Sequence, residues 1–221
     1  MARINNPRGG VLSPPLFAVF CSGFGSNLQA IIGAVRRKKM RAVLALVVSD
    51  RADAFALVRA RRAGIAILVV DPADFSDRSG YEKYLVRQLR ARKITHVVLA
   101  GFMRILSPYF VRCYRQRIVN IHPSLLPAFP GKDGIAAALA HGVKVSGVTV
   151  HVVDQRVDHG PIIAQQAIDV RPEDTRDSLA QRIHRVEYRI YPRVLSAWFE
   201  NKVVIEGRKV RIDDGNTGSK D

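Results

Sequence analysis

Asn120 and His122 are polar side chains in a short apolar segment, within the stretch NIHPSLLPAFPG, and a proline-rich loop follows them at once. Residues two apart in an extended strand point to the same face, so these side chains project together. Pro123 favours an extended backbone at His122, which places the pair at the end of the strand. Buried polar groups are costly without partners. The pair is therefore either a hydrogen-bonded structural feature or part of a site.

A second polar segment could complete such a site. The stretch GVTVHVVDQRVDHGPII places Asp154 and Asp158 in a loop between two apolar runs. A carboxylate beside His122 would raise the basicity of the imidazole and fix its orientation. Asn120, His122 and Asp158 together could stabilise an oxyanion and move a proton. The sequence has no Ser or Cys nucleophile motif and no metal-ligand spacing. We therefore expect direct transfer to an amine or to water, with no metal.

A glycine-rich loop, CSGFGSN, follows the first apolar run and opens the first helical pattern. Glycines let backbone amides approach an anion, and the N-terminus of a helix adds partial positive charge. We predict that Gly25, Ser26 and Asn27 bind a phosphate group. Two alternatives remain open. One is a dinucleotide site, favoured by Asp50 after the second strand but not by Leu28 at the third small-residue position. The other is a tight turn in which Ser26 is a helix N-cap.

Alternating strand and helix patterns would position these groups. The strands that we expect are Leu16–Ser22, Ala42–Ser49, Ala66–Val70, His96–Ala100, Ile118–His122, Ser146–Val153 and Ile162–Asp169. The helices that we expect are Ser26–Arg37, Ala52–Ala63, Ser79–Lys93, Ser107–Tyr114, Gly134–His141 and Thr175–Glu200. The alternation up to residue 122 predicts an α/β fold with a doubly wound, mostly parallel sheet. The last two strands have no helix between them, which predicts an antiparallel extension, and a small terminal hairpin should turn at Gly207.

The bulk composition is that of an ordinary globular domain. The chain has 221 residues, 48% of them hydrophobic, and no apolar run long enough to span a membrane. Its two cysteines, Cys21 and Cys113, have no paired spacing, so we expect reduced thiols and a cytoplasmic location. We expect a flexible extension over residues 1–15, one domain over 16–212 and a flexible tail over 213–221. The sequence does not distinguish a monomer from a homodimer.

The net charge of +16 comes from 35 Lys and Arg against 19 Asp and Glu. Three interpretations compete: a nucleic-acid footprint, a field that attracts small anionic substrates, or an arginine-rich composition without specific meaning. The basic clusters fall on four different predicted helices, at residues 36–39, 59–62, 87–93 and 112–117. Nucleic-acid binders usually gather their charge on one element, so this dispersal argues against a nucleic-acid partner.

The motifs CSGFGSNLQAII, LAGFMRILSP, NIHPSLLPAFPG and the stretch from Gly147 to Ile163 resemble those of the phosphoribosylglycinamide (glycinamide ribonucleotide) formyltransferase family, in the same order. The resemblance covers roughly residues 16–200. It implies a Rossmann-like formyltransferase fold and a role in de novo purine biosynthesis. The implied reaction moves the formyl group of the cosubstrate 10-formyltetrahydrofolate to the amine of glycinamide ribonucleotide, giving formylglycinamide ribonucleotide and tetrahydrofolate.

The resemblance also implies roles for individual residues. Asn120, His122 and Asp158 match the catalytic residues of the family. The substrate-binding positions are Gly25, Ser26, Asn27 and Glu187. The folate-binding positions are Arg78, Met103, Arg104, Ile105, Leu106, Asn120 and Asp154. Protonated His122 and the Asn120 amide would stabilise the charge on the formyl oxygen, while Asp158 would hold His122 and relay a proton.

Two positions depart from the family pattern. Lys132-Asp133 stands where the family commonly carries a His, and an inward-pointing Asp133 would add negative charge beside His122. Phe24, between the loop glycines, replaces a smaller residue, and we expect it to affect packing only. Among the other histidines, we expect His151 to be structural. His96, His141, His159 and His184 read as surface or loop residues, although His184 could touch the substrate phosphate.

Four alternative functions remain to be separated. Formyltetrahydrofolate hydrolase and methionyl-tRNA formyltransferase share the Asn-His-Asp arrangement. The first usually carries an N-terminal regulatory domain and the second a C-terminal RNA-binding domain, and we expect neither here. A non-catalytic nucleic-acid-binding module would use the positive charge, with binding that weakens steeply with salt. A dinucleotide-dependent oxidoreductase would bind NAD(P).

Overall fold

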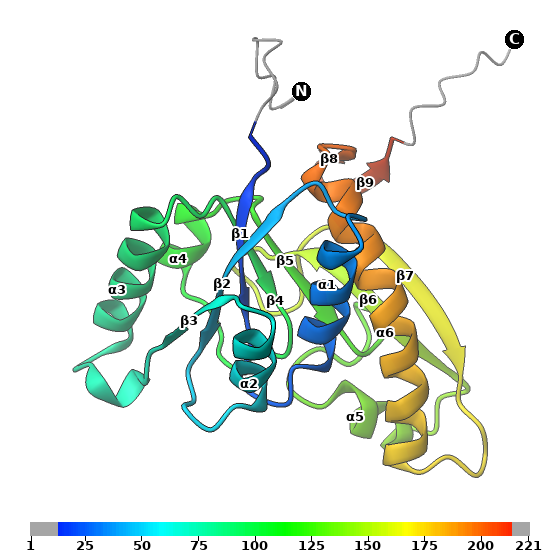
Figure 1. Cartoon of the computed structure of the whole chain (residues 1–221). Coiled ribbons are helices and arrows are strands. Elements are labelled where there is room, and N and C mark those ends of the chain that lie inside the picture. Colours follow the sequence, from blue (N-terminus) through cyan, green and yellow to red (C-terminus); the bar gives the residue numbers. More distant parts are fainter. Residues whose placement is uncertain (1–12, 214–221) are drawn as a thin grey trace, which may run out of the picture.

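In the computed structural model, which describes residues 13–213, a seven-stranded sheet forms the centre of the molecule (Figure 1). The strand order is β3-β2-β1-β4-β5-β6-β7. The strands are β1 Leu16–Phe20, β2 Val43–Ser49, β3 Ala66–Val69, β4 His96–Leu99, β5 Ile118–His122, β6 Val145–Val152 and β7 Ile162–Asp169. Strands β1 to β5 pair in parallel, whereas β6 and β7 join antiparallel. The predicted mostly parallel sheet with an antiparallel extension is confirmed.

Helices cover both faces of this sheet (Figure 1). They are α1 Ser26–Arg36, α2 Phe55–Arg62, α3 Arg78–Ala91, α4 Pro108–Cys113, α5 Gly134–Ala140 and α6 Arg176–Phe199. Alternate residues of β1 belong to the two different cores. Phe17 and Val19 pack with α1 and α6, and Ala18 and Phe20 pack with α3 and α4. A strand that is buried on both faces is apolar throughout, which explains the unbroken run LFAVF.

Side-chain caps mark the N-termini of helices α3, α4, α5 and α6. The Thr175 side chain accepts from the Ser178 amide, and the two residues form a reciprocal capping box. Ser107 caps α4, with Pro108 at its first position. Helix α2 starts three residues later than we expected, because Ala54 is still extended. A short 3-10 helix, η1 Pro72–Asp74, lies where we expected a loop.

A terminal hairpin is made of β8 Val203–Glu206 and β9 Lys209–Ile212 and turns at Gly207, as predicted. It forms a sheet of its own, and β9 packs against β7. Cys21 and Cys113 are both free thiols. Within residues 13–213, no helix is long and apolar enough to cross a membrane. The flexible extension and tail predicted for residues 1–15 and 213–221 lie almost wholly outside the described residues.

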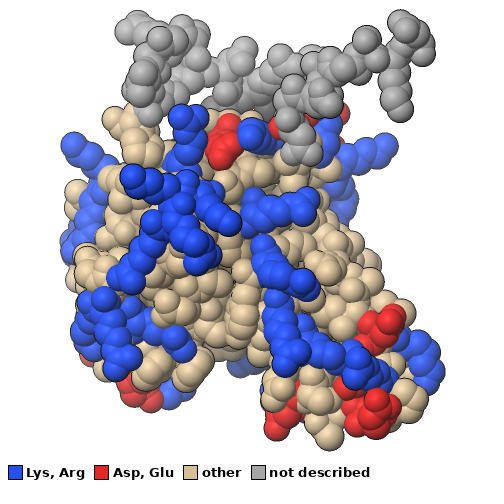
Figure 2. Space-filling model, turned by 45° about the vertical axis from the view of Figure 1, so that its right-hand side comes forward, with Lys and Arg blue, Asp and Glu red and all other residues tan. Residues whose placement is uncertain are grey.

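The basic side chains are dispersed, as the sequence indicates. Figure 2 shows Lys and Arg side chains spread over much of the visible face of the molecule. Part of the excess lies in the last turns of helices, at Arg36 in α1, Arg90 in α3 and Arg112 in α4. Cations there interact favourably with the partial negative charge of the helix C-terminus. These three arginines are therefore placed where their charge favours the helix.

Candidate active site

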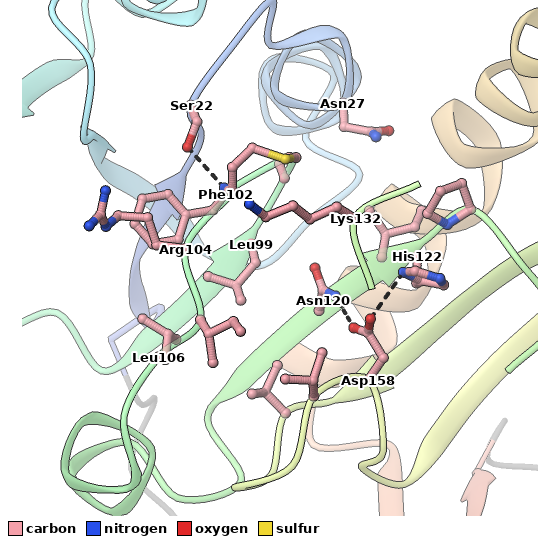
Figure 3. Close-up of a pocket in the computed structure, with 18 of the residues that line it drawn as sticks. Ser22, Asn27, Leu99, Phe102, Arg104, Leu106, Asn120, His122, Lys132 and Asp158 are labelled. Atoms are coloured by element: carbon pink, nitrogen blue, oxygen red, sulfur yellow. Dashed lines mark hydrogen bonds and ion pairs between the residues drawn. The ribbon is translucent and has the colours of Figure 1, made fainter. Parts of the chain in front are cut away.

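A cavity of about 610 Å³ lies at the carboxyl ends of β1, β4 and β5, where the strand order of the sheet changes direction. Ligands of open α/β sheets bind at this kind of position. All the predicted site residues except Arg78 line the cavity: Gly25, Ser26, Asn27, Met103, Arg104, Ile105, Leu106, Asn120, His122, Asp154, Asp158 and Glu187. Residues that are far apart in the sequence therefore share one chamber (Figure 3).

Asn120, His122 and Asp158 meet at one end of the cavity (Figure 3). Nδ1 of His122 lies 3.4 Å from Oδ2 of Asp158. Nδ2 of Asn120 donates to Oδ1 of the same carboxylate at 3.4 Å. Strand β5 supplies the first two residues from one face, and the loop after β6 returns to supply the third. The predicted grouping of an amide, an imidazole and a carboxylate is present.

Both ring nitrogens of His122 face oxygen atoms. Nε2 lies 2.8 Å from the carbonyl oxygen of Phe129, while Nδ1 faces Asp158. Because a carbonyl and a carboxylate can only accept, a protonated ring would satisfy both contacts. The His122 side chain is almost fully buried. A formyl oxygen in the cavity would therefore have to replace one of these acceptors to receive a hydrogen bond from His122.

Asp158 is held as a carboxylate. Burial alone would raise its pKa, but hydrogen bonds from His151 and from the Gly131 amide, together with the charge of His122, hold the pKa below its ordinary value. The Gly131 amide donates to Oδ2 at 2.8 Å. An ionised Asp158 suits the orientation of His122 and the stabilisation of positive charge on it.

His151 belongs to the same cluster, although we expected only a structural role. Its Nε2 lies 3.2 Å from Nδ2 of Asn120 and 3.6 Å from Oδ1 of Asp158. The antiparallel register of β5 and β6 places His151 directly opposite Asn120. Cross-strand partners have adjacent side chains. The sequence shows both strands but not their register, so it carries no signal for this contact.

The glycine loop packs closely against α2 at Gly25, where the absence of a side chain leaves room for Ala56. Gly25 has φ 72° and is the N-cap of α1, without a side-chain cap. A Cβ atom there would lie 2.7 Å from Cβ of Ala56 on α2. Ser26 is the first helical residue, so the alternative that Ser26 is the N-cap is wrong. The loop residues at the start of α1 line the cavity, and the N-terminus of a helix favours anions.

Glu187 of α6 joins the loop to a histidine. Its Oε2 accepts from Nδ2 of Asn27 at 2.9 Å and lies 2.9 Å from Nδ1 of His184. The hydrogen bond to Glu187 raises the pKa of His184 against the effect of burial. His184 also lines the cavity. It is therefore a partly buried residue of the cavity wall, and its protonated form would place positive charge near the loop.

The segment after β4 forms the opposite, apolar wall. Met103 and Ile105 are exposed within the cavity, while Leu106 is buried beneath them. The amide of Met103 donates to Oγ of Ser22 at 3.0 Å, which ties the segment to the end of β1. Apolar side chains with a few polar groups are typical of a pocket for a small organic molecule.

Arg78 lies outside the cavity lining. Its Nε donates to Oε1 of Glu82 at 3.3 Å, and its Nη2 donates to the carbonyl oxygen of Ile105. Glu82 also accepts from the amide of Ser107 at 2.7 Å. Arg78 therefore supports the apolar segment from behind in this arrangement, and a folate contact from it stays a prediction.

The structure places the residues at the two positions that depart from the family pattern, Lys132-Asp133 and Phe24. Asp133 caps α5 and lies 3.2 Å from Arg176, so it does not point toward His122. Lys132 instead lines the cavity, and its side chain extends over Asn120 in Figure 3. Phe24 is 65% exposed and lines the cavity.

Phe24 and α2 form an aromatic and cationic layer beside the glycine loop. The rings of Phe24 and Phe55 stack with centroids 5.0 Å apart. The guanidinium of Arg59 lies 4.5 Å from the Phe24 ring centroid, and its Nε donates to the Phe24 carbonyl oxygen at 3.0 Å. These contacts hold the loop on α2.

His96 differs from its predicted surface position. It packs edge-on against Trp198, with ring centroids 4.8 Å apart. Burial, and secondarily Arg117, lowers its pKa to about 4. Among residues 13–213, no group of three or more His, Cys, Asp or Glu side chains is arranged to hold a metal ion.

Comparison with known proteins gives consistent matches over most of the chain. The model of the formyl transferase family matches residues 16–195. The phosphoribosylglycinamide formyltransferase of Bacillus subtilis is 42% identical over 179 residues, which cover 81% of this chain and 92% of that protein. The Escherichia coli enzyme of the same name is 42% identical over 200 residues, covering 87% and 94%.

Solved structures agree with these matches. Glycinamide ribonucleotide transformylase 1 from Symbiobacterium toebii superposes with a TM-score of 0.89 and 47% identity, covering 90% of this chain and 94% of that one. Phosphoribosylglycinamide formyltransferase from Bacillus halodurans gives a TM-score of 0.80 and 42% identity, covering 82% and 93%.

Proposed function

The chain belongs to the formyl transferase family, and we infer from this premise that it is an enzyme that formylates glycinamide ribonucleotide in de novo purine biosynthesis. We propose 10-formyltetrahydrofolate as the formyl donor. The observation that carries this proposal is one cavity that holds a phosphate-binding type of loop, a polar cluster and an apolar wall. These three parts suit a phosphorylated amine, a reacting formyl group and a pterin ring, respectively.

The nucleotide would occupy the side of the cavity formed by the start of α1. Its phosphate would accept from the amides of Gly25, Ser26 and Asn27, where the helix dipole favours negative charge. His184 would add a cationic contact. Glu187 would accept from hydroxyl or amide groups of the same substrate, because its carboxylate is buried at the cavity wall. This orientation sends the substrate amine toward Asn120.

The folate would lie against the wall made by Met103, Ile105 and Leu106, bordered by Asp154. This position brings the formyl group of the cosubstrate to Asn120 and Asp158. Holding both reactants in a fixed orientation accelerates the reaction between them, because the two no longer have to meet in solution. Arg104 would pair with a carboxylate or carbonyl of the folate.

The proposed roles of the polar residues follow from the negative charge that forms on the formyl oxygen during the reaction. The amine attacks the formyl carbon, a C–N bond forms, and negative charge grows on the formyl oxygen. The Asn120 amide and protonated His122 would stabilise that oxygen, in exchange for their present protein partners. Collapse of the tetrahedral species breaks the bond to N10 of the folate, which takes up a proton. Asp158 would hold His122 in orientation and pass on the proton that the amine loses.

A product assay tests this function directly. The purified chain is mixed with 10-formyltetrahydrofolate, with and without glycinamide ribonucleotide, and the products are identified by mass spectrometry. Formylglycinamide ribonucleotide and tetrahydrofolate should form only when the nucleotide is present. Release of formate without the nucleotide would instead identify the hydrolase. Oligomeric state, as monomer or homodimer, and a cytoplasmic location stay predictions.

A further inference from the structure

The loop that carries Asp158, residues 153–161, is closed at its base and has a demanding backbone. The amide of Val152 donates to the carbonyl oxygen of Pro161 at 2.9 Å. A Cβ atom at Gly160 would overlap the carbonyl oxygen of Val152, so the chain passes close to β6 there. Asp158 itself has φ 49°, a left-handed conformation that residues with a side chain seldom adopt. Contacts from elsewhere must maintain this conformation.

Part of the support comes from within the loop. Oδ1 of Asp154 accepts from the amide of Arg156 at 2.9 Å. Oδ2 of Asp154 lies 2.8 Å from Nδ1 of His159, the residue next to Asp158. The Asp154 carboxylate therefore links the two ends of the turn. The carbonyl oxygen of His159, in contrast, accepts from a residue outside the loop.

Arg208 provides the donor for that carbonyl. Its Nη2 donates to the carbonyl oxygen of His159 at 2.9 Å, and its Nη1 lies 3.3 Å from both ring nitrogens of His159. The guanidinium thus contacts both the backbone and the side chain of one residue. A charged donor gives a stronger hydrogen bond than a neutral one.

Arg208 comes from a separate part of the fold, immediately after Gly207 at the turn between β8 and β9. The hairpin is fixed in place by apolar side chains. Val203, Ile205, Val210 and Ile212 pack against the core that β1 shares with α1 and α6. A rigid element therefore presents the guanidinium to the loop, and little side-chain entropy beyond that of Arg208 is lost in the contact.

We propose that the terminal hairpin braces the catalytic loop and that Arg208 is a positioning residue for Asp158. This inference rests on the proposed function. Arg208 holds the carbonyl of His159, which fixes the adjoining Asp158 backbone and keeps its carboxylate 3.4 Å from His122. Arg208 does not line the cavity. Its loss should therefore lower turnover and leave substrate binding largely intact.

The matched control lies on the same hairpin. Arg211 is an exposed arginine of β9 that pairs with Asp213 and makes no contact with the loop among the interactions of the described residues. Arg208→Ala and Arg211→Ala remove the same charge from the same element. Arg208→Lys keeps the charge but cannot contact the carbonyl and the ring together, so it separates geometry from net charge.

Three measurements decide the proposal. Arg208→Ala should lower kcat roughly three- to tenfold, with both KM values within about twofold of the original, because one charged hydrogen bond is lost. Arg208→Lys should recover only part of this loss.

Amides of residues 154–160 should exchange with solvent faster in Arg208→Ala than in Arg211→Ala. In an Asp158→Asn background, Arg208→Ala should have no further effect on kcat, since its effect acts through Asp158.

The outcomes separate the two proposals. Equal kcat in Arg208→Ala and Arg211→Ala would overturn the bracing role, as would unchanged amide exchange or an undiminished effect in the Asp158→Asn background. If the unmodified protein fails to formylate glycinamide ribonucleotide, the proposed function is wrong. The exchange comparison would still report whether Arg208 holds the loop, because it does not depend on activity.

Discussion

Nδ1 of His122 lies 3.4 Å from Oδ2 of Asp158, and the Gly131 amide lies 2.8 Å from the same oxygen. One carboxylate therefore joins β5, the loop after it and the loop after β6. The imidazole is nearly inaccessible to solvent, so its orientation depends on this carboxylate and on the Phe129 carbonyl. Removing the carboxylate charge should affect chemistry more than folding.

Asp158→Asn should lower kcat about 10²–10³-fold, the typical cost of losing one electrostatic group at a reacting centre. The amide has nearly the same shape, so the midpoint of thermal unfolding should change little. Steady-state kinetics with both substrates saturating would measure the effect. Asp133→Asn is the matched control, because Asp133 caps α5 on the exposed side and Asn is also a good N-cap. Near-normal turnover in Asp158→Asn would remove Asp158 from the mechanism.

The sequence predicts the elements well because the hydrophobic pattern and the caps determine them locally. Strands Ile118–His122 and Ile162–Asp169 have the predicted bounds. The capping box at Thr175 and the turn at Gly207 are likewise local signals. Helix α2 starts later than predicted because its N-cap, Ala54, has an extended backbone. Local chemistry therefore fixes the fold class and most element ends.

The contacts of the site are less predictable because they depend on three-dimensional register. His151 enters the polar cluster only because β6 pairs antiparallel with β5 in one register. Asp133 turns outward because it caps α5, and this leaves Lys132 at the cavity. The resemblance to a family located the residues that line the cavity, but it could not show how they hydrogen-bond.

His184 should make binding of glycinamide ribonucleotide depend on pH. Its pKa is raised by the hydrogen bond to Glu187, so in the folded protein it stays protonated above its ordinary value of 6.5. As pH rises through this raised pKa, the positive charge is lost and KM for the nucleotide should increase. The phosphate is already mostly a dianion above about pH 6, so its own titration does not produce this trend.

His184→Gln should flatten that dependence and raise KM roughly three- to tenfold at the lower end of the range, because a charged contact to the phosphate is lost. The measurement is KM for the nucleotide between pH 6.5 and pH 9, at saturating folate. His141→Gln is the control, since His141 is exposed at the end of α5 and away from the cavity lining. A parallel rise of KM with pH in His184→Gln and in the unmodified protein would contradict the assignment.

Gly25→Ala should disrupt the glycine loop for two reasons. The left-handed backbone at φ 72° disfavours a side chain, and the new Cβ would lie 2.7 Å from Cβ of Ala56. We expect the free energy of unfolding to fall by about 2–3 kcal/mol. KM for the nucleotide should also rise, because α1 and α2 must separate at the loop.

Gly23→Ala provides the comparison from the same loop, since nothing lies within 4 Å of a Cβ atom at Gly23. Urea unfolding of both variants would measure the difference in stability. Equal stability of the two variants would show that the loop can move away from Ala56 without cost, and that its conformation is not set by this contact.

His96 should make the protein sensitive to mild acid, at a site far from the cavity. Burial against Trp198, and secondarily the charge of Arg117, lowers the His96 pKa to about 4, whereas the unfolded chain has the ordinary value of 6.5. Between these values the unfolded state binds more protons, so stability falls as pH falls. The free energy of unfolding should fall by about 2 kcal/mol between pH 7 and pH 5.

The His96→Gln side chain cannot titrate, so the free energy of unfolding of this variant should change less over that pH range. His141→Gln should keep the pH dependence of the original protein. Urea unfolding at intervals of pH would measure both profiles, and a slope that persists in His96→Gln would assign the acid sensitivity to other groups.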